Sequence, residues 1–275
     1  MRSDRTPPPG SATRPVVRFE RGIRTEDDDR LAEEVPVAMH FDGAPFAVMM
    51  TTPADLEDFA RGFAFTEGKI DTVLDIVHIE VREVFEGIVV DVRTAGGLTA
   101  APARTETKEA RELPGRSGCG ICGSRELEDV VRHPAPVAAG PTLTVDAIER
   151  ALETLRAQQP INAFTGSVHA AAWALPDGSI VKVREDVGRH NALDKLIGAM
   201  LADGTDPRAG FLVITSRASY EMVTKAAVAG ITIVVAISAP TALAVHLAAD
   251  CGVTLIGFAR SGRFNVYSRP ERIAE

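Results

Sequence analysis

Two short apolar runs decide the fold: residues 211–215 read FLVIT and residues 231–237 read ITIVVAI. Each run is continuously apolar, as expected for parallel strands that are covered on both faces. Helical patterns and a third strand alternate with these runs, over residues 188–202, 219–229, 241–249 and 253–258. This alternation predicts an α/β layer in which helices pack on a largely parallel sheet.

Strand patterns extend from these runs towards the N-terminus. Residues 169–175 and 179–184 read as a hairpin around Pro176-Asp177-Gly178. Thr144 is placed to cap a helix whose apolar face is Ile148, Leu152 and Leu155. A Pro/Ala stretch over 133–141 precedes this helix and marks a domain boundary.

The first half of the chain predicts a smaller α+β domain. Its expected elements are strands over 16–20 and 35–51 with a turn at Asp42-Gly43, a helix that begins at Thr52-Pro53 and ends near Gly68, and a hairpin over 76–93. Residues 94–123 show no periodicity and read as a long loop. We therefore expect a disordered tail over 1–15, the α+β domain over 16–140, and the α/β domain over 141–275.

Composition excludes several classes of protein. The 275 residues are 45% hydrophobic and 25% charged, as in an ordinary globular protein, and the net charge of −8 argues against non-specific nucleic-acid binding. No window is apolar enough to span a membrane, and the polar first 15 residues lack the apolar core of a signal peptide. We therefore expect a cytoplasmic protein with no membrane partner.

Two thiols stand out in the segment SGCGICG, residues 117–123. Glycines around Cys119 and Cys122 leave the backbone free to bring either sulfur close to a partner. Nearby arginines and a helix predicted from Ser124 add positive potential, which lowers the pKa of a thiol and favours the reactive thiolate. The pattern therefore favours sulfur chemistry.

Four interpretations of this pair compete. The thiols could be an idle reduced pair, or half of a structural zinc site, although no second closely spaced ligand pair exists. A zinc deaminase would need H-x-E before P-C-x-x-C, but His78 and Glu80 lie in an alternating strand pattern and glycine precedes Cys119. Sulfur or disulfide exchange fits best, and a lone C-x-x-C leaves a dithiol and a persulfide carrier undistinguished. Cys251 follows an apolar helix and reads as a packing residue.

Polar loops follow three successive predicted strands. They are Thr215-Ser216-Arg217, Ser238-Ala239-Pro240-Thr241 and Phe258-Ala259-Arg260-Ser261-Gly262-Arg263. Because parallel strands end at one edge of a sheet, we expect these loops to meet and to bind a phosphate-bearing ligand through arginines and helix N-termini. Short polar loops follow strands in every α/β protein, which is the plainer interpretation. Neither a dinucleotide fingerprint nor a P-loop is present.

A further polar cluster runs from Arg184 to Asn191, in the sequence REDVGRHN. It joins a predicted strand to a predicted helix and reads either as part of a site or as a solvated run of charges. His169 starts a strand and fits a half-buried position.

Several of these segments together resemble one known family. The cysteine loop, TGSVHAAAW, REDVGRHNALDKLIG, EMVTKAAVAGI, SAPTALAVHLA and GFARSGRFNVY occur in order, and RGFAFTEGKI matches the N-terminal part. Over about residues 35–267 the chain resembles the formate dehydrogenase accessory sulfurtransferase (FdhD) family. Because several long motifs agree, the resemblance is specific.

The resemblance implies a function and a second-domain fold. Such proteins receive persulfide sulfur from a cysteine desulfurase and pass it to the molybdenum of the bis(molybdopterin guanine dinucleotide) cofactor that formate dehydrogenase requires. The second domain is then cytidine-deaminase-like without the zinc, no resident metal is expected, and the protein is a homodimer. GDP is expected to mimic part of the cofactor.

The resemblance also assigns residues. It places the persulfide on Cys119, with Cys122 as its partner, and the cofactor on the stretch Phe258–Arg263. Together with the strand-end loops, the expected cofactor-binding residues are Thr215, Ser216, Arg217, Ser238, Phe258, Ala259, Arg260, Ser261, Gly262 and Arg263. A dithiol oxidoreductase and a non-catalytic chaperone for the cofactor or the apoenzyme remain alternatives.

Overall fold

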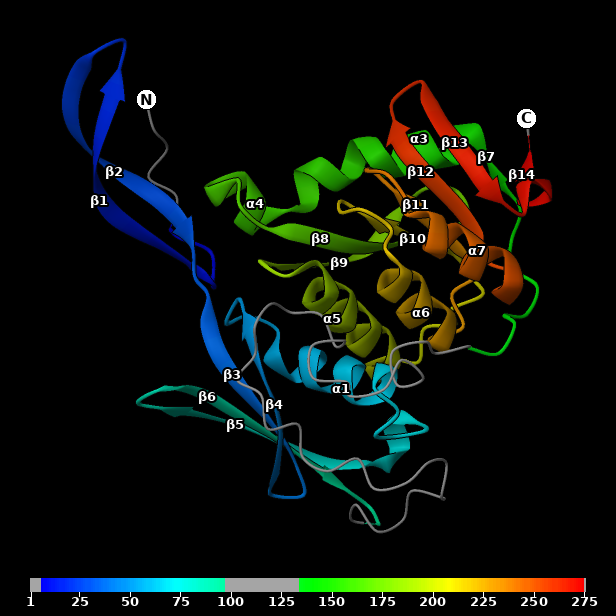
Figure 1. The fold of residues 1–275 in the computed structure, drawn as a ribbon, viewed down its shortest axis with the longest axis horizontal. Helices are drawn as coiled ribbons and strands as arrows, with labels where there is room; N and C mark the ends of the chain where they lie inside the picture. Colours follow the sequence, from blue (N-terminus) through cyan, green and yellow to red (C-terminus); the bar gives the residue numbers. More distant parts are fainter. Residues whose placement is uncertain (1–5, 97–133, 275) are drawn as a thin grey trace.

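A six-stranded sheet in the order β13-β12-β11-β10-β8-β9 is the centre of the second half of the chain (Figure 1). The computed structural model describes residues 6–96 and 134–274. The strands of this sheet are β8 (His169–Ala174), β9 (Ile180–Asp186), β10 (Phe211–Ile214), β11 (Ile233–Ala236), β12 (Thr254–Arg260) and β13 (Arg263–Ser268). Helices cover both of its faces, so the α/β class expected from the alternating pattern is confirmed.

Within this six-stranded sheet, parallel pairing is confined to three neighbouring strands. β10, β11 and β12 run parallel, as the two continuous apolar runs predict. β8 pairs antiparallel with β10 and with β9, and β13 pairs antiparallel with β12. The expectation of a largely parallel sheet therefore holds for the middle of the sheet, while hairpins supply its outer strands.

Each face of this sheet buries its own core. The helices α5 (Arg189–Ala202), α6 (Tyr220–Val228) and α7 (Ala242–Cys251) pack on one face. The helix α3 (Val145–Leu155) packs on the other face through Ile148, Leu155 and the half-buried Leu152, the face that the sequence predicts. Thr144 caps α3 as expected, since its hydroxyl accepts a hydrogen bond from the backbone N–H of Ala147.

The first half of the chain forms a second sheet in the order β4-β3-β6-β5. Its strands are β3 (Val35–Phe41), β4 (Ala44–Thr51), β5 (Ile76–Val84) and β6 (Gly87–Thr94), and the helix α1 (Leu56–Thr66) covers one face. Asp42 and Gly43 both have positive φ, which confirms the predicted tight turn.

The start of α1 corrects one expectation. The helix begins at Leu56, and its N-cap is Asp55 rather than Thr52. The hydroxyl of Thr52 instead accepts a hydrogen bond from the backbone N–H of Val187, in the other half of the chain. A contact between the two halves of the chain has therefore replaced the local cap.

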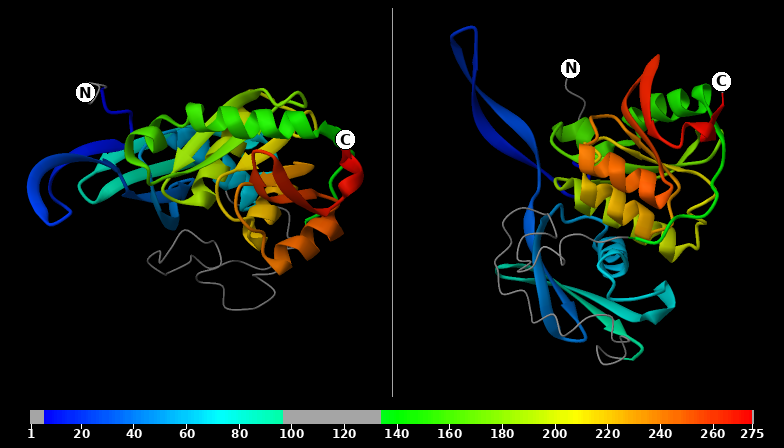
Figure 2. Two further views of the ribbon diagram at one scale, coloured as in Figure 1. Left: turned by 90° about the horizontal axis from the view of Figure 1, so that it is seen from above. Right: turned by 45° about the vertical axis from the view of Figure 1, so that its right-hand side comes forward.

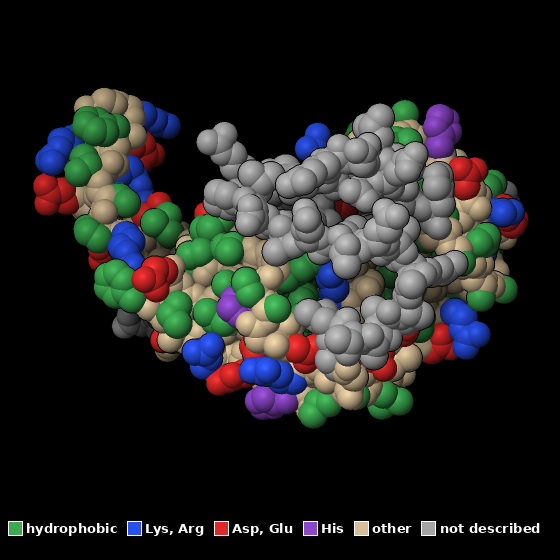
Figure 3. Space-filling model, turned by 60° about the horizontal axis from the view of Figure 1, so that its bottom comes forward, with side chains coloured by type: hydrophobic (Ala, Val, Ile, Leu, Met, Phe, Trp, Pro, Cys, Tyr) green, Lys and Arg blue, Asp and Glu red, His purple; other side chains and the backbone are tan. Residues whose placement is uncertain are grey.

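A two-stranded ribbon extends away from the body (Figures 1 and 2). It consists of β1 (Ser11–Glu20) and β2 (Ile23–Ala32), which pair antiparallel along their whole length. Residues 11–15, expected in a disordered tail, thus form the first half of β1. Phe19 on this ribbon is 69% exposed. Figure 3 shows the ribbon at its upper left, where hydrophobic and charged side chains are mixed on the surface.

Short elements complete the described chain. The helix α4 (Pro160–Thr165) supports the base of the ribbon, where the guanidinium of Arg30 lies 4.4 Å from the ring centroid of Phe164. β7 (Leu143–Thr144) pairs with β14 (Ile273–Ala274), and 3-10 turns occupy Val73–Asp75, Arg156–Gln158 and Pro270–Arg272. Among residues 6–96 and 134–274, no helix is long and apolar enough to cross a membrane.

The two halves meet where α1 crosses α5. The crossing is close because glycine occupies both contact points, Gly62 on α1 and Gly198 on α5. A Cβ at Gly62 would lie 1.8 Å from the carbonyl oxygen of Asp194, and one at Gly198 would lie 1.8 Å from that of Asp58. Only glycine permits this backbone approach.

Candidate functional site at the strand ends

The loops that follow β10, β11 and β12 form one continuous edge, as the sequence predicts. The N–H of Ala218 donates to the carbonyl of Ala239 at 3.2 Å, which joins the first loop to the second. The N–H of Phe258 donates to the carbonyl of Ser238 at 3.0 Å, which joins the second to the third. The structure thus brings the three predicted loops together.

The first loop presents one arginine to solvent. Thr215 is half-buried, and its hydroxyl accepts the N–H of Ala170 at 2.9 Å and lies 3.5 Å from His169 Nδ1. Ser216 is buried and donates to the carbonyl of Arg217. Arg217 itself is exposed. Of the three predicted binding residues, only the Arg217 side chain is directed to solvent.

Helix N-termini add positive potential to this edge. α6 begins directly after the first loop, and α7 begins after the second, where Thr241 caps it by accepting the N–H of Ala244 at 3.3 Å. The first N–H groups of a helix favour anions because they lack partners within the helix. The edge is therefore suited electrostatically to a phosphate.

The third loop is a hairpin, not an open loop. β12 continues to Arg260 and turns back at Ser261-Gly262 into β13. Phe258 and Arg260 are exposed while Ala259 between them is buried. A guanidinium N–H of Arg260 donates to the carbonyl of Ile237, which holds this arginine against the second loop.

The tip of the hairpin is tied to α3. Glu149 accepts the N–H of Gly262 at 2.9 Å, and Glu153 accepts the hydroxyl of Ser261 at 3.5 Å. Two donors expected to serve a phosphate are thus already bonded to carboxylates. Arg263 follows them and is exposed.

The cluster from Arg184 to Asn191 lies beside this edge and is not a solvated run of charges. His169, at the start of β8, pairs across the sheet with Asp186. Burial, and then the charge of Arg189, lower the pKa of His169. Glu185, Asp186, His190 and Asn191 are all buried, so the solvated interpretation is wrong for these four.

Asp186 is the centre of a buried polar network between the two halves of the chain. One carboxylate oxygen accepts the hydroxyl of Thr51 and the N–H of Thr52. The other accepts the N–H of Gly188 at 2.7 Å and the side-chain amide of Asn191 at 3.1 Å. The end of β4 is thereby fixed to the start of α5.

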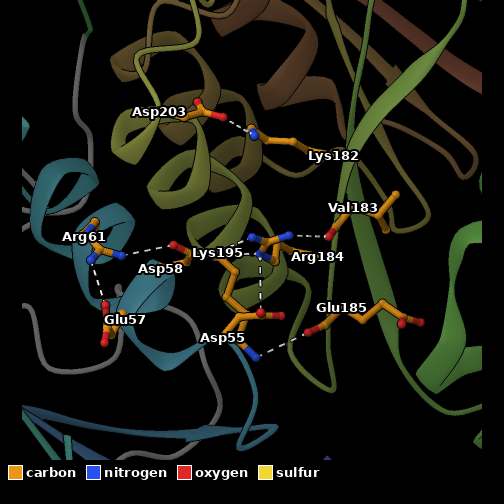
Figure 4. A network of polar contacts seen from close by, with 10 residues as sticks. All are labelled: Asp55, Glu57, Asp58, Arg61, Lys182, Val183, Arg184, Glu185, Lys195 and Asp203. Carbon is orange, nitrogen blue, oxygen red and sulfur yellow. Dashed lines mark hydrogen bonds and ion pairs between the residues drawn. The ribbon is translucent and has the colours of Figure 1, made fainter. Parts of the chain in front are cut away.

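A second contact between the halves involves Arg184 (Figure 4). Its guanidinium donates two hydrogen bonds to one oxygen of Asp58, at 2.7 and 3.0 Å, and lies 3.7 Å from Asp55. Glu185, the next residue, accepts the N–H groups of Ile161 and Asn162 at the start of α4. Consecutive residues of β9 thus hold α1 and α4.

A further buried ion cluster joins α1, α5 and α6. Lys225 donates to Asp194 at 2.9 Å and to the hydroxyl of Thr66 at 2.9 Å. Near the starts of α5 and α6, His190 Nε2 on α5 lies 3.2 Å from Glu221 on α6. The sequence did contain a signal for these buried ion pairs, because charged residues interrupt the otherwise apolar faces of α5 and α6.

The remaining candidate residues from the sequence are the cysteines and the H-x-E motif. Cys119 and Cys122 lie outside the described residues. His78 is exposed and Glu80 is half-buried and paired with Arg82, so this H-x-E lies on the sheet surface. Cys251 is buried, as expected, and burial raises the pKa of its thiol. Within residues 6–96 and 134–274, no three His, Cys, Asp or Glu side chains gather as metal ligands would.

Comparison with known proteins places the chain in a family. The FdhD/NarQ family profile matches residues 32–274. The sulfur carrier protein FdhD of Xanthomonas euvesicatoria is 50% identical over 98% of this chain and 95% of its own length. That of Cupriavidus necator is 47% identical over 97% of this chain and 91% of its own.

A solved structure agrees with this assignment. The crystal structure of a formate dehydrogenase accessory protein from Desulfotalea psychrophila superposes with a TM-score of 0.76 at 27% identity, over 97% of this chain and all of that one. The sequence resemblance to FdhD proteins is thereby confirmed in both sequence and fold. The chain belongs to the FdhD/NarQ family.

Proposed function

We propose that this protein carries sulfur as a persulfide on Cys119 and delivers it to a molybdenum cofactor held at the strand-end edge. The names of its relatives, sulfur carrier and formate dehydrogenase accessory protein, support the general activity. The observation that carries the choice of recipient is the edge itself, where three loops and exposed arginines meet beside two helix N-termini.

The loading step requires a thiolate. Cys119 attacks the outer sulfur of a persulfide on a cysteine desulfurase, so that one S–S bond forms as another breaks. The donor cysteine leaves as a thiolate, and no external oxidant is needed. The arginines near the cysteine pair in the sequence favour the thiolate form of Cys119.

The delivery step returns Cys119 to its starting state. The terminal sulfur bonds to the metal of the substrate, the S–S bond breaks, and Cys119 is released as a thiolate. The two electrons that convert the sulfane sulfur into a sulfido ligand come from the reduced metal. Before delivery, Cys122 has one of two roles. As a relay, its thiolate attacks the outer sulfur of the Cys119 persulfide, takes that sulfur and releases Cys119 as a thiolate. As a resolving residue, it attacks the inner sulfur of an undelivered persulfide, which releases hydrosulfide and leaves a disulfide.

The recipient is the bis(molybdopterin guanine dinucleotide) cofactor, as substrate. Arg217, Arg260 and Arg263 bind its phosphates, and Thr215 and Ser238 belong to the same loops at this edge. Charge-assisted hydrogen bonds of this kind are stronger than neutral ones. We further propose that the protein acts as a homodimer and that formate dehydrogenase receives the finished cofactor.

Mass spectrometry tests the loading step. After incubation with a cysteine desulfurase and cysteine, the protein should gain the mass of one sulfur atom, and Cys119→Ala should not, because the thiolate of Cys119 is the nucleophile. Cys251→Ala is the matched control, because this buried thiol should be dispensable. Sulfur gain by Cys119→Ala, together with active formate dehydrogenase, would contradict the assignment. A Cys119–Cys122 disulfide without any persulfide would favour the dithiol oxidoreductase.

Calorimetry with GDP tests the recipient site. Arg217→Ala, Arg260→Ala and Arg263→Ala should each weaken binding by about 1.5–3 kcal/mol if each contacts a phosphate. Arg208→Ala is the control, because Arg208 pairs with Asp206 before β10, at the opposite end of the strand. Unchanged GDP affinity in all three variants would refute the site. Full function with both cysteines replaced would indicate a chaperone.

A further inference from the structure

We propose that a small oxyanion binds between the starts of α5 and α6, against Arg189, His169 and Ser219. This oxyanion site takes a tetrahedral anion of the class of phosphate, sulfate and molybdate. It goes beyond the proposed function, because none of the three residues belongs to the proposed recipient site. β10 and β11 lie between β8 and β12 in the sheet, so His169 is separated from the β12–β13 turn by at least about 14 Å, three strand spacings.

The sheet brings His169 and Arg189 to the same edge. His169 begins β8, and its partner across the antiparallel pair is Asp186, the last residue of β9. The chain then passes Gly188, the N-cap of α5, and Arg189 is the first residue of this helix. The positive charge of Arg189 lowers the pKa of His169, second only to burial, so the guanidinium and the imidazole are near each other.

Ser219 reaches the same place from the neighbouring helix. It is the N-cap of α6 and follows the loop of Thr215, whose hydroxyl lies 3.5 Å from His169 Nδ1. The starts of α5 and α6 are adjacent, since His190 Nε2 lies 3.2 Å from Glu221. Polar side chains from β8, from α5 and from the cap of α6 therefore gather where the two helices begin.

Arg189 is a cation with no partner among residues 6–96 and 134–274. Its Nε atom is buried and forms no hydrogen bond, and its guanidinium forms no ion pair there. The carboxylates beside it in the sequence are engaged, because Asp186 pairs with Lys195 and Glu185 accepts two N–H groups of α4. A buried donor without an acceptor is destabilising, and an anion bound at Arg189 removes that cost.

The hydroxyl of Ser219 also lacks a partner. A serine at an N-cap normally accepts a hydrogen bond from an N–H in the first turn of its helix. Ser219 forms no such bond, and its buried Oγ atom has no hydrogen-bond partner in the part of the chain that the structure describes. This hydroxyl can therefore donate to an anion at the positive end of α6.

His169 adds a neutral donor. Because its pKa is lowered from 6.5, the imidazole is uncharged at neutral pH and keeps one N–H group. Arg189 supplies the charge, and its planar guanidinium can bind two oxygens of one oxyanion. Arg189 repels a cation, and an apolar ligand would leave all these donors unpaired, so an oxyanion is the ligand that fits.

Equilibrium dialysis with molybdate tests the site, because bound molybdenum can be counted directly by elemental analysis. The protein should bind a single molybdate per chain, and sulfate and phosphate should compete for it. Arg189→Gln should weaken molybdate binding by about 10- to 150-fold, as the loss of a hydrogen bond to a charged group does. Ser219→Ala should weaken it by about 2- to 10-fold, as the loss of a neutral hydrogen bond does.

Two further variants control for charge and for folding. Arg208→Gln removes an arginine that pairs with Asp206 at the opposite end of β10, and should bind molybdate as tightly as the parent. Arg189→Lys keeps the positive charge and should bind molybdate more tightly than Arg189→Gln. Thermal melts followed by circular dichroism check that every variant is folded. A folded Arg189→Gln variant with parental molybdate affinity would refute the site.

Saturating GDP separates the oxyanion site from the proposed recipient site. Molybdate should bind equally well with and without GDP, and Arg263→Ala should lose GDP but keep molybdate. If GDP displaces molybdate, or if Arg263→Ala loses both, the anion lies on the strand-end arginines and the inference is wrong, while the proposed recipient site stands. If molybdate binds and GDP does not, the recipient site fails and the oxyanion site stands. A parent that binds none of the three oxyanions refutes the inference.

Discussion

Lys195 Nζ lies 2.7 Å from the Oδ2 atom of Asp186, and both side chains are completely buried. The same ammonium donates to the carbonyls of Thr52 at 2.9 Å and Glu185 at 3.3 Å. One cation on α5 thus neutralises the carboxylate that holds the end of β4 and satisfies two carbonyls from different halves of the chain. The pair fixes the end of β4 against β9 and α5.

Replacement of Lys195 by methionine should destabilise the protein by about 3–5 kcal/mol, because Asp186 would be left as a buried charge without its cation. Urea denaturation followed by circular dichroism measures the loss. Lys182→Met is the control, since its pair with Asp203 lies nearer the surface and should contribute about 0–1 kcal/mol. Equal losses in the two variants would contradict a special role for the Lys195 pair.

The Lys225 cluster predicts a loss of stability at alkaline pH. Burial acts to lower the pKa of Lys225, but the charges of Asp194 and Glu67 outweigh it and hold this pKa above its usual value. Because the pKa of Lys225 is higher in the folded state than in the unfolded state, the cluster stabilises the protein. This stabilisation is fully present at pH values below the pKa of lysine in the unfolded chain, about 10.4. That stability is lost as pH rises through the folded pKa. Urea unfolding between pH 8 and 11 should show the decline.

The matched variants isolate this contribution. Lys225→Met should be less stable at pH 8 and should decline less steeply above about pH 10, the usual range for lysine. Lys182→Met should retain the slope of the parent. A parental slope in Lys225→Met would assign the alkaline loss to other groups.

The second half of the fold was predictable because its signals are local. Continuous apolar runs identified β10 and β11, and turn residues identified the hairpin of β8 and β9. The hairpin of β12 and β13 was missed, because Ser261-Gly262 looks the same in a tight turn and in an open loop. The strand expected over residues 16–20 is confirmed within β1, but its partner β2 was missed, because β2 is rich in charge and buries little, so no apolar alternation marks it.

The candidate site was predictable in position but not in detail. Parallel strands end at the same edge of a sheet, so the sequence could predict that the loops of Arg217 and Ser238 meet. The burial of Asp186 could not, because a run such as Arg184–Asn191 has the same sequence whether it faces water or a partner domain. The left-handed backbone conformation of Phe258 could not be predicted either, because it depends on the contacts of Gly257 with Pro240 and Tyr267.

Cys251 should react slowly with alkylating reagents in the folded protein. Burial, with a smaller effect from Asp250, raises the pKa of this thiol, and its Sγ donates to the carbonyl of Pro134. Thiolate formation and access are therefore both reduced. Mass spectrometry after iodoacetamide treatment at pH 8 should find Cys251 unmodified in buffer and modified in urea. Equal rates in the two conditions would contradict the predicted protection.

The glycine crossing of α1 and α5 should tolerate no side chain. Gly62→Ala places a methyl group against the Asp194 carbonyl, and Gly198→Ala places one against that of Asp58. Each should cost about 3 kcal/mol or more, the upper end of the cost of overpacking, because backbone cannot move aside as a side chain can.

Gly204→Ala separates this clash from the general effect of losing a glycine. Gly204 has φ +70° and nothing within 4 Å of an added Cβ, so its replacement costs only backbone strain, about 1–2 kcal/mol. Urea denaturation should rank both crossing variants below this control. A crossing variant with parental stability would show that α1 and α5 can separate freely, and the rigid connection between the halves would then be refuted.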